Sequence, residues 1–189
     1  HFEPEEPHTS SSCQPCHTTK GFIVARDPSI SENGFQPTNF LLRSTLNEGI
    51  ACAACHDPHR VGMGDHQLRV ITNVTFAITN ATFPSGVVST NGGAGLLCMN
   101  CHRDRYDANA RLAAKGTPHR GTQGDMLYGM NAIEYGMDMP SSRHLNVIPD
   151  TCVTCHKQPS PTNGPAMNKV GGHTWKLRYD NDTPTDESD

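Results

Sequence analysis

The sequence predicts one domain that is mostly coil, with short α-helices and a single small β element near residues 68–90. Two observations on composition carry this prediction. Apolar residues make up 34% of the 189 residues, while Gly and Pro are frequent, at 17 and 14 copies. A globular domain typically has about 45–50% apolar residues when Gly is counted with them. We therefore expect another chemical group to supply apolar mass that the side chains lack.

The composition also excludes several classes of protein. The formal net charge is -4 and no basic cluster is present, so we expect no nucleic-acid partner. The mean hydropathy is -0.56, and no run of 18 apolar residues occurs, so we expect no membrane span. Charged residues make up only 18%, which is not typical of a disordered chain.

Every cysteine belongs to a pair, and a histidine directly follows every pair. The four C-x-x-C-H motifs are residues 13–17, 52–56, 98–102 and 152–156, which we call motifs 1 to 4. This spelling is typical of covalent haem c attachment, in which two thiols add to the vinyl groups of one porphyrin. His is 11 of 189 residues, so chance would place it after all four pairs in about one sequence in 10⁵. The sequence therefore predicts four haem c groups, bound through Cys13, Cys16, Cys52, Cys55, Cys98, Cys101, Cys152 and Cys155.

Other uses of paired cysteines explain the sequence less well. Two Cys₄ zinc sites or four disulfides would leave the four following histidines unexplained. A thioredoxin-like redox site would need one such pair on a βαβ unit rather than four scattered copies.

The histidine of each motif is the expected proximal ligand of its iron, which gives His17, His56, His102 and His156. Seven further histidines are available for the distal positions, so we favour paired His at all four irons. Methionine is the alternative distal ligand and would raise the reduction potential. Met126, Met130 and Met137 are more typical of residues that pack against a core or a haem.

His59 is the strongest distal candidate. Pro58 fixes its own φ and drives Asp57 towards extended geometry, so His59 is expected to point away from the haem of motif 2 and towards a neighbouring one. A surface histidine after a turn is the alternative.

Three more distal candidates follow from local sequence. His119 comes after an expected helix end, and His144 lies in an irregular stretch before motif 4. His173 follows two glycines, which allow the backbone to approach a flat ligand closely. An exposed histidine is the alternative for each. The reserve candidates are His8, then His66 and His1, and which histidine completes which haem stays open.

The order of elements along the chain follows from composition and periodicity. Residues 1–12 are acidic and Pro-rich, which predicts an extended arm that is either frayed or docked on another subunit. Residues 13–179 form the expected domain, and residues 180–189 an acidic, solvated tail. Within 68–90, β-branched residues alternate and a Pro-Ser-Gly turn leads to Val87 and Val88, which predicts two paired strands. Residues 96–115 predict a helix, and residues 125–138 a weaker helix interrupted by Gly129 and Gly136.

Haem c is attached outside the cytoplasm, so we expect an exported protein. The chain begins at His1 without Met or an apolar leader, which we interpret as a mature chain whose signal peptide has been removed. Asn73, Asn80 and Asn181 lie in N-glycosylation sequons, with ordinary Thr-rich strand and tail residues as the alternative.

The chain resembles a tetrahaem c-type cytochrome throughout its length. More narrowly, it resembles the OmcE-like extracellular cytochromes that polymerise into filaments, or nanowires. The segments that carry this resemblance are the four motifs, the run 55–59, Pro118 and His119 with residues 123–127, and residues 171–175. The last two segments are also similar to parts of larger periplasmic multihaem proteins.

The resemblance implies a multihaem cytochrome c fold, with paired-His ligation and a continuous chain of haems through each subunit. It further implies that a histidine of the neighbouring subunit completes one haem, and that haems stack in alternating parallel and T-shaped pairs. We therefore expect a non-enzymatic electron carrier at the cell surface or outside the cell, with copies of itself and redox proteins as partners.

Two other functions remain as alternatives. A soluble periplasmic electron shuttle would have the same haem content, and its negative charge would suit a basic redox partner. A multihaem redox enzyme would need an open iron position, which is less compatible with so many available histidines.

Overall fold

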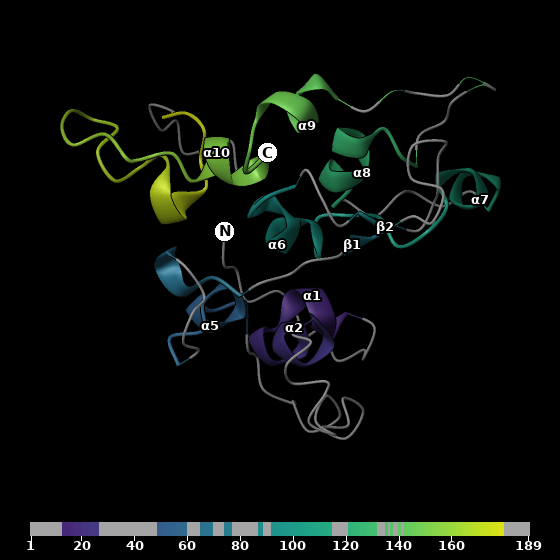
Figure 1. Cartoon of the computed structure of the whole chain (residues 1–189), viewed down its shortest axis with the longest axis horizontal. Helices are drawn as coiled ribbons and strands as arrows, with labels where there is room; N and C mark the ends of the chain where they lie inside the picture. Colours follow the sequence, from purple (N-terminus) through teal and green to yellow (C-terminus); the bar gives the residue numbers. More distant parts are fainter. Residues whose placement is uncertain are drawn as a thin grey trace.

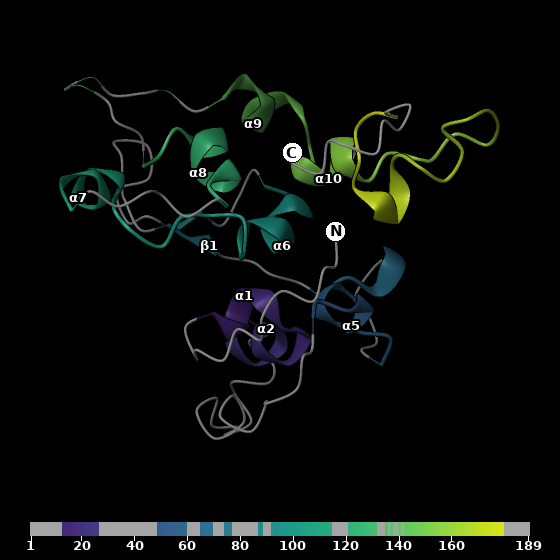
Figure 2. The same ribbon diagram turned by 180° about the vertical axis from the view of Figure 1, so that it is seen from behind.

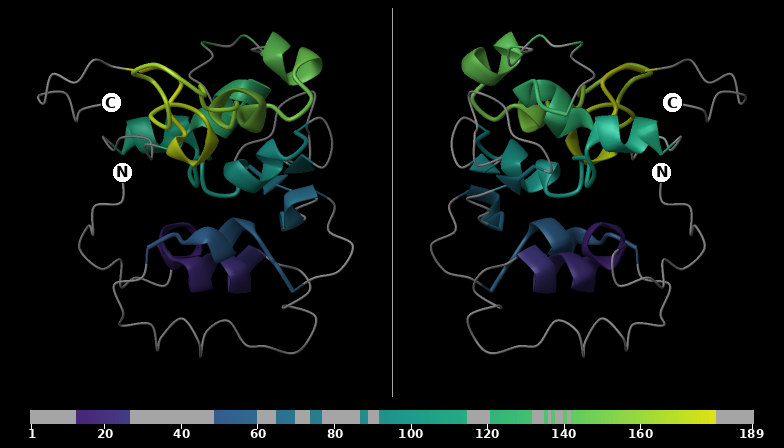
Figure 3. Two further views of the ribbon diagram at one scale, coloured as in Figure 1. Left: turned by 90° about the vertical axis from the view of Figure 1, so that its left-hand side faces the viewer. Right: turned by 90° about the vertical axis from the view of Figure 1, so that its right-hand side faces the viewer.

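The computed structural model describes residues 13–26, 49–59, 65–69, 74–76, 87–88, 92–114, 121–131, 135, 137, 140 and 142–179. These residues are mostly coil with short helices and little strand, as the sequence predicts. Helices α1, α2 and α5 lie together on one side of the molecule, and α6 to α10 with the strands lie on the other (Figures 1 and 2). The side views in Figure 3 show the same two layers.

The first layer is built from α1 (Gln14–His17), α2 (Thr19–Arg26) and α5 (Cys52–Cys55). The absence of a side chain at Gly21 lets α2 approach α1, because a Cβ there would lie 2.2 Å from the Gln14 carbonyl oxygen. The Thr19 hydroxyl donates to the Gly49 carbonyl at 2.9 Å and accepts from the Ala51 amide at 2.7 Å. One hydroxyl therefore ties the chain that leads into α5 to the start of α2.

The helix expected over 96–115 is wrong in one respect, because the chain forms two helices there. These are α6 (Gly95–Met99) and α7 (Ala108–Ala113). Between them the Asp104 carboxylate accepts from the amides of the two residues that follow it, which is turn geometry. Asp107 then starts α7 by accepting from the Asn109 and Ala110 amides at 2.7 and 3.0 Å. Side-chain hydrogen bonding of the two aspartates thus overrides helix propensity.

The next two helices also correct the sequence prediction. Helix α8 (Gln123–Tyr128) starts before the predicted helix and ends at Gly129, which is left-handed at φ 63°. Met130, Asn131, Tyr135 and Met137 are not helical. The stretch expected to be irregular around His144 is helix α9 (Arg143–Val147), because Ser142 caps it by accepting from the His144 amide at 3.2 Å.

The predicted β element is confirmed as a short hairpin. Strand β1 (Val74–Thr75) pairs antiparallel with β2 (Val87–Val88), with Val74 opposite Val88. Three further elements are η1 (Asp65–Gln67), α10 (Cys152–His156) and η2 (Gly172–Thr174).

Two small apolar clusters make up the core of the described residues. The larger lies under the hairpin, α6, α8 and α9, and contains Val74, Phe76, Leu96, Met99, Tyr128, Met130 and Leu145. The smaller joins the two layers through Phe22 of α2, Ala54 of α5 and Leu97 of α6. Met130 is thus a core residue, whereas Met126 and Met137 are exposed.

Several sequence predictions lie outside the described residues. They concern the arm 1–12, the tail 180–189, the sequon residues Asn73, Asn80 and Asn181, and the ligand candidates His1, His8 and His119. None of the helices formed by the described residues is long and apolar enough to cross a lipid bilayer.

Candidate functional site

Each C-x-x-C-H motif lies on or at the end of a short helix. Motifs 1, 2 and 4 form α1, α5 and α10, and motif 3 begins in α6 and continues into the turn after it. Residues three apart lie on the same face of a helical turn, so the two thiols of each motif project together. No disulfide joins any of the eight cysteines, all of which belong to the described residues.

Motif 3 contacts motif 1 reciprocally. The Cys16 thiol lies 3.7 Å from the Asn100 carbonyl oxygen, and the Cys101 thiol lies 4.0 Å from the Pro15 carbonyl oxygen. Each motif therefore places a sulfur against the backbone between the two cysteines of the other. Segments more than 80 residues apart in sequence are brought side by side in this way.

Motif 3 also contacts motif 4. The Cys98 and Cys152 thiols interact with each other, which lowers the pKa of Cys152 and raises that of Cys98. Next to this pair, the Thr151 hydroxyl donates to the Gly92 carbonyl at 2.9 Å. The helices α6 and α10 are thereby held together at their motif cysteines.

The contact between motifs 2 and 3 is apolar. Cys55 and Cys101 pack against the smaller core cluster, whose members include Ala54 and Leu97. Burial raises the pKa of the Cys55 thiol. Motif 3 therefore contacts each of the other three motifs.

Three of the motif histidines have the ring nitrogen Nδ1 bound to a carbonyl oxygen. His56 Nδ1 lies 2.7 Å from the His66 carbonyl, and His156 Nδ1 lies 2.8 Å from the Trp175 carbonyl. His102 Nδ1 lies 3.3 Å from Oε1 of Gln123. A carbonyl oxygen can only accept, so Nδ1 carries the proton and the lone pair is on Nε2. This is the arrangement that readies a histidine to bind a metal through Nε2.

The two backbone acceptors share an unusual conformation. His66 and Trp175 both have left-handed backbone, at φ 65° and 63°. This region is uncommon for residues other than Gly, Asn, Asp and His, so it is least expected at Trp175. The sequence carried no signal for either acceptor, and it had suggested His66 only as a reserve iron ligand.

His173 lies close to motif 2, although it is far from it in sequence. Its ring centroid is 6.1 Å from that of His56, with the ring planes tilted by 45°. The nearby Lys157 ammonium lowers the pKa of His173. The glycines before it have positive φ, 65° at Gly171 and 52° at Gly172.

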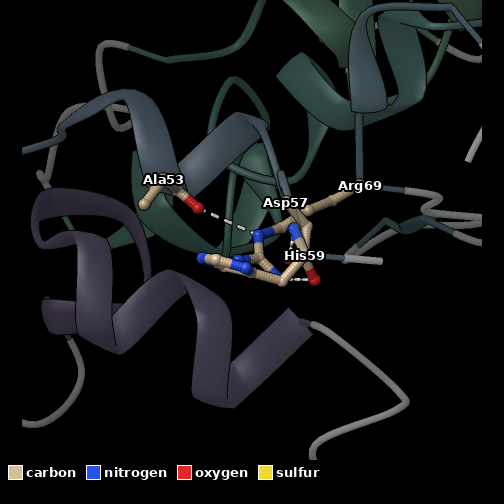
Figure 4. Close-up of polar contacts among 4 residues, drawn as sticks. All are labelled: Ala53, Asp57, His59 and Arg69. Atoms are coloured by element: carbon tan, nitrogen blue, oxygen red, sulfur yellow. Dashed lines mark hydrogen bonds and ion pairs between the residues drawn. The ribbon is translucent and has the colours of Figure 1, made fainter. Parts of the chain in front are cut away.

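His59 and His144 are both exposed. Figure 4 shows His59 beside an ion pair in which Arg69 Nη1 lies 3.3 Å from Asp57 Oδ2. Arg69 Nε also donates to the Ala53 carbonyl at 2.9 Å, and the His59 amide donates to Asp57 Oδ1 at 3.3 Å. These bonds fix the turn after motif 2, and the predicted role of His59 as a ligand stays a prediction.

No protein-family model, curated protein or solved structure matches the chain. Within the described residues, no group of three or more His, Cys, Asp or Glu side chains gathers around a common metal position. Instead, each motif has the same set of reactive side chains, two thiols and one imidazole. This set fits a porphyrin whose iron takes one histidine from each face.

Proposed function

We propose that the protein transfers electrons through four covalently attached haem c groups, and that it does so as the subunit of an extracellular filament. The observation that carries the proposal is the recurrence of one donor set. Four helical motifs each present two thiols and a histidine. In three of them a hydrogen bond holds Nδ1, so the lone pair of Nε2 is left to bind a metal. Cys₄ zinc sites or disulfides would leave these oriented histidines without a role.

The roles of the chain's own residues follow from this arrangement. The cysteines hold the porphyrins, the motif histidines bind iron through Nε2, and the carbonyl acceptors fix the imidazole orientation. The haems, once bound, supply the one-electron chemistry. Motif 3 contacts the other three motifs, which favours short transfer distances between groups attached there. An iron that takes a histidine on each face would have no open position, which favours electron transfer over catalysis.

The small core supports the same proposal. The described residues bury only two apolar clusters, while Trp175 and Leu177 near motif 4 are exposed. Four porphyrins would supply the apolar mass that this small core lacks.

The haem content is tested by expressing the chain in a host that attaches haem c and measuring its intact mass. We expect the polypeptide mass plus four haems, and an alkaline pyridine spectrum of haem c. Four double variants, each with both cysteines of one motif changed to Ala, should each retain three haems. A polypeptide mass alone, or a chain that carries zinc, would contradict the proposal.

The filament is tested separately, by electron microscopy of native material at neutral pH. Filaments with a repeat of one subunit are the expected result. Discrete particles containing four haems would instead support the periplasmic shuttle and contradict only this half of the proposal. A low-spin spectrum that is unchanged by cyanide or nitrite is expected from a carrier, whereas an enzyme with an open iron would respond.

A further inference from the structure

One turn of the chain, residues 171–175, reaches two different motifs. Its last carbonyl, that of Trp175, lies 2.8 Å from Nδ1 of His156 in motif 4. Its middle side chain, His173, faces His56 of motif 2 at a centroid separation of 6.1 Å. The turn therefore stands between two predicted haem positions.

The His56–His173 separation is that of two imidazoles bound on opposite faces of one metal ion. A bond of about 2 Å from metal to nitrogen, and about 1.1 Å from that nitrogen to its ring centroid, gives about 6 Å across the pair. Direct packing of the rings would also permit much shorter separations, since aromatic centroids approach to about 4.5 Å. A 45° tilt is compatible with ligation, because each ring can turn about its own metal–nitrogen bond.

The hydrogen bonds of His56 favour the same geometry. Its Nδ1 is occupied by the His66 carbonyl at 2.7 Å, so Nε2 is the nitrogen left for a metal. Within the described part of the chain, neither His59 nor His144 makes a ring contact with a motif histidine, whereas His173 does.

The turn holds His173 in place through its backbone. The Gly172 amide donates to the Gln158 carbonyl at 2.8 Å, and the Gly171 amide donates to the Lys176 carbonyl at 2.9 Å. A Cβ on Gly171 would lie 2.2 Å from the Gln158 carbonyl oxygen, so a side chain there would push the turn away. Lys157 adds a cation–π contact, with Nζ 4.9 Å from the Trp175 ring centroid.

We propose that His173 is the distal iron ligand of the haem attached at Cys52 and Cys55, while the Trp175 carbonyl orients the proximal ligand of the haem attached at Cys152 and Cys155. The inference rests on the proposed function. It assigns one distal ligand to one motif, and it makes the 171–175 turn a mechanical link between two haems. A change of ligand at the motif 2 haem therefore alters the hydrogen bond between His156 and the Trp175 carbonyl at the motif 4 haem.

The test uses the full haem-loaded chain and reads the spin state by electron paramagnetic resonance and absorption. His173→Ala should convert one of the four haems to high spin, and added imidazole should restore it. Lys176→Ala changes an exposed side chain beside the same turn but keeps the carbonyl that binds the Gly171 amide, so it is the matched control and should leave all four haems low-spin. If His173→Ala leaves all four haems low-spin, the inference is overturned while the haem content still stands.

The assignment to motif 2 is tested by combining variants. In a chain with Cys52→Ala and Cys55→Ala, which should carry three haems, adding His173→Ala should create no high-spin haem. A high-spin haem in that background would place His173 at another iron and overturn the assignment. A wild-type chain without haem would instead overturn the proposed function.

A second variant tests the same assignment if the chain with Cys52→Ala and Cys55→Ala does not fold or does not take up haem. Cys52→Ser leaves one thioether and one free vinyl group, so the haem of motif 2 should have a red-shifted α-band. In Cys52→Ser with His173→Ala, the shifted α-band should disappear as the high-spin signal appears, because a high-spin haem gives no sharp α-band. A shifted α-band that persists beside a high-spin signal would overturn the assignment.

Discussion

The histidines of motifs 2 and 4 are held differently from that of motif 3. His56 and His156 donate to backbone carbonyls of left-handed residues. His66 lies within η1, and Trp175 directly follows η2. His102 instead lies against the side chain of Gln123, the first residue of α8. The proton on Nδ1 is therefore accepted by a side chain in motif 3 and by the carbonyl of a left-handed residue in motifs 2 and 4.

The difference determines what each site is sensitive to. A backbone acceptor survives replacement of its own side chain but depends on the shape of its turn. A side-chain acceptor can be removed by one substitution while the fold remains, because α8 is anchored independently. The Gly124 amide donates to the His102 carbonyl at 2.8 Å, and Asp125 Oδ2 accepts from the Asp104 amide at 2.7 Å. The backbone acceptors are thus insensitive to substitution of their own side chains. The side-chain acceptor instead allows one substitution to change the potential of the motif 3 haem.

The largest effect is expected where a backbone acceptor loses its turn. Gly171→Ala places a Cβ at φ 65° and 2.2 Å from the Gln158 carbonyl oxygen. Left-handed strain and overpacking together should lower the free energy of unfolding by about 2–4 kcal/mol. Denaturation in urea measures this, and the potential of the motif 4 haem should change with it because the Trp175 carbonyl moves.

Gly164→Ala is the matched control for this substitution. Gly164 also has positive φ, 80°, but a Cβ there would meet no atom within 4 Å. Gly164→Ala should lower the free energy of unfolding by about 1–2 kcal/mol through backbone strain alone and leave all haem potentials unchanged. Equal effects of the two substitutions on the motif 4 haem would show that the 171–175 turn does not hold His156.

The local parts of the fold could be predicted from the sequence. The alternation around Val74 identified the hairpin that the structure forms, and Gly171 and Gly172, where the backbone was expected to approach a flat ligand, have positive φ. The C-x-x-C-H spacing predicts haem attachment at eight cysteines and four histidines, and that assignment stays a prediction. Each of these signals has a direct local cause.

The acceptors could not be predicted, because nothing in a sequence marks His66 or Trp175 as left-handed. Both residues lie in segments that are bound to other parts of the chain: the chain after His66 pairs with motif 2 through the bridge between His56 and Leu68, and the turn before Trp175 is bound to Gln158. The break between α6 and α7 was missed for a related reason. Asp104 is fully buried, and its backbone amide is bound by Asp125 from α8, which propensity along the chain does not reveal.

An intermediate effect is expected at the side-chain acceptor. Gln123→Leu removes the oxygen near His102, so the imidazole donates less charge to ferric iron and the potential of the motif 3 haem should rise. Gln123→Glu provides a stronger acceptor and should lower it. Since a tenfold change in a one-electron equilibrium corresponds to about 60 mV, we expect shifts of about 30–60 mV. Spectroelectrochemical titration of the full chain measures both.

Gln67→Leu is the control, because Gln67 is exposed and its amide donates to the Pro58 carbonyl rather than accepting from a motif histidine. It should leave all four potentials in place. If Gln123→Leu and Gln123→Glu moved the potential in the same direction, hydrogen-bond acceptance would not be the cause.

The smallest effect is expected when a backbone acceptor keeps its turn and changes only its side chain. His66→Asn retains the carbonyl that binds His56, and Asn tolerates left-handed backbone better than most residues. We expect an unchanged low-spin spectrum and a change of less than about 1 kcal/mol in the free energy of unfolding. His66→Val is the contrast, because a β-branched residue at φ 65° strains the turn and should perturb the motif 2 haem. A high-spin haem in His66→Asn would instead mean that the His66 imidazole is itself an iron ligand, and the division between backbone and side-chain acceptors would not hold at motif 2.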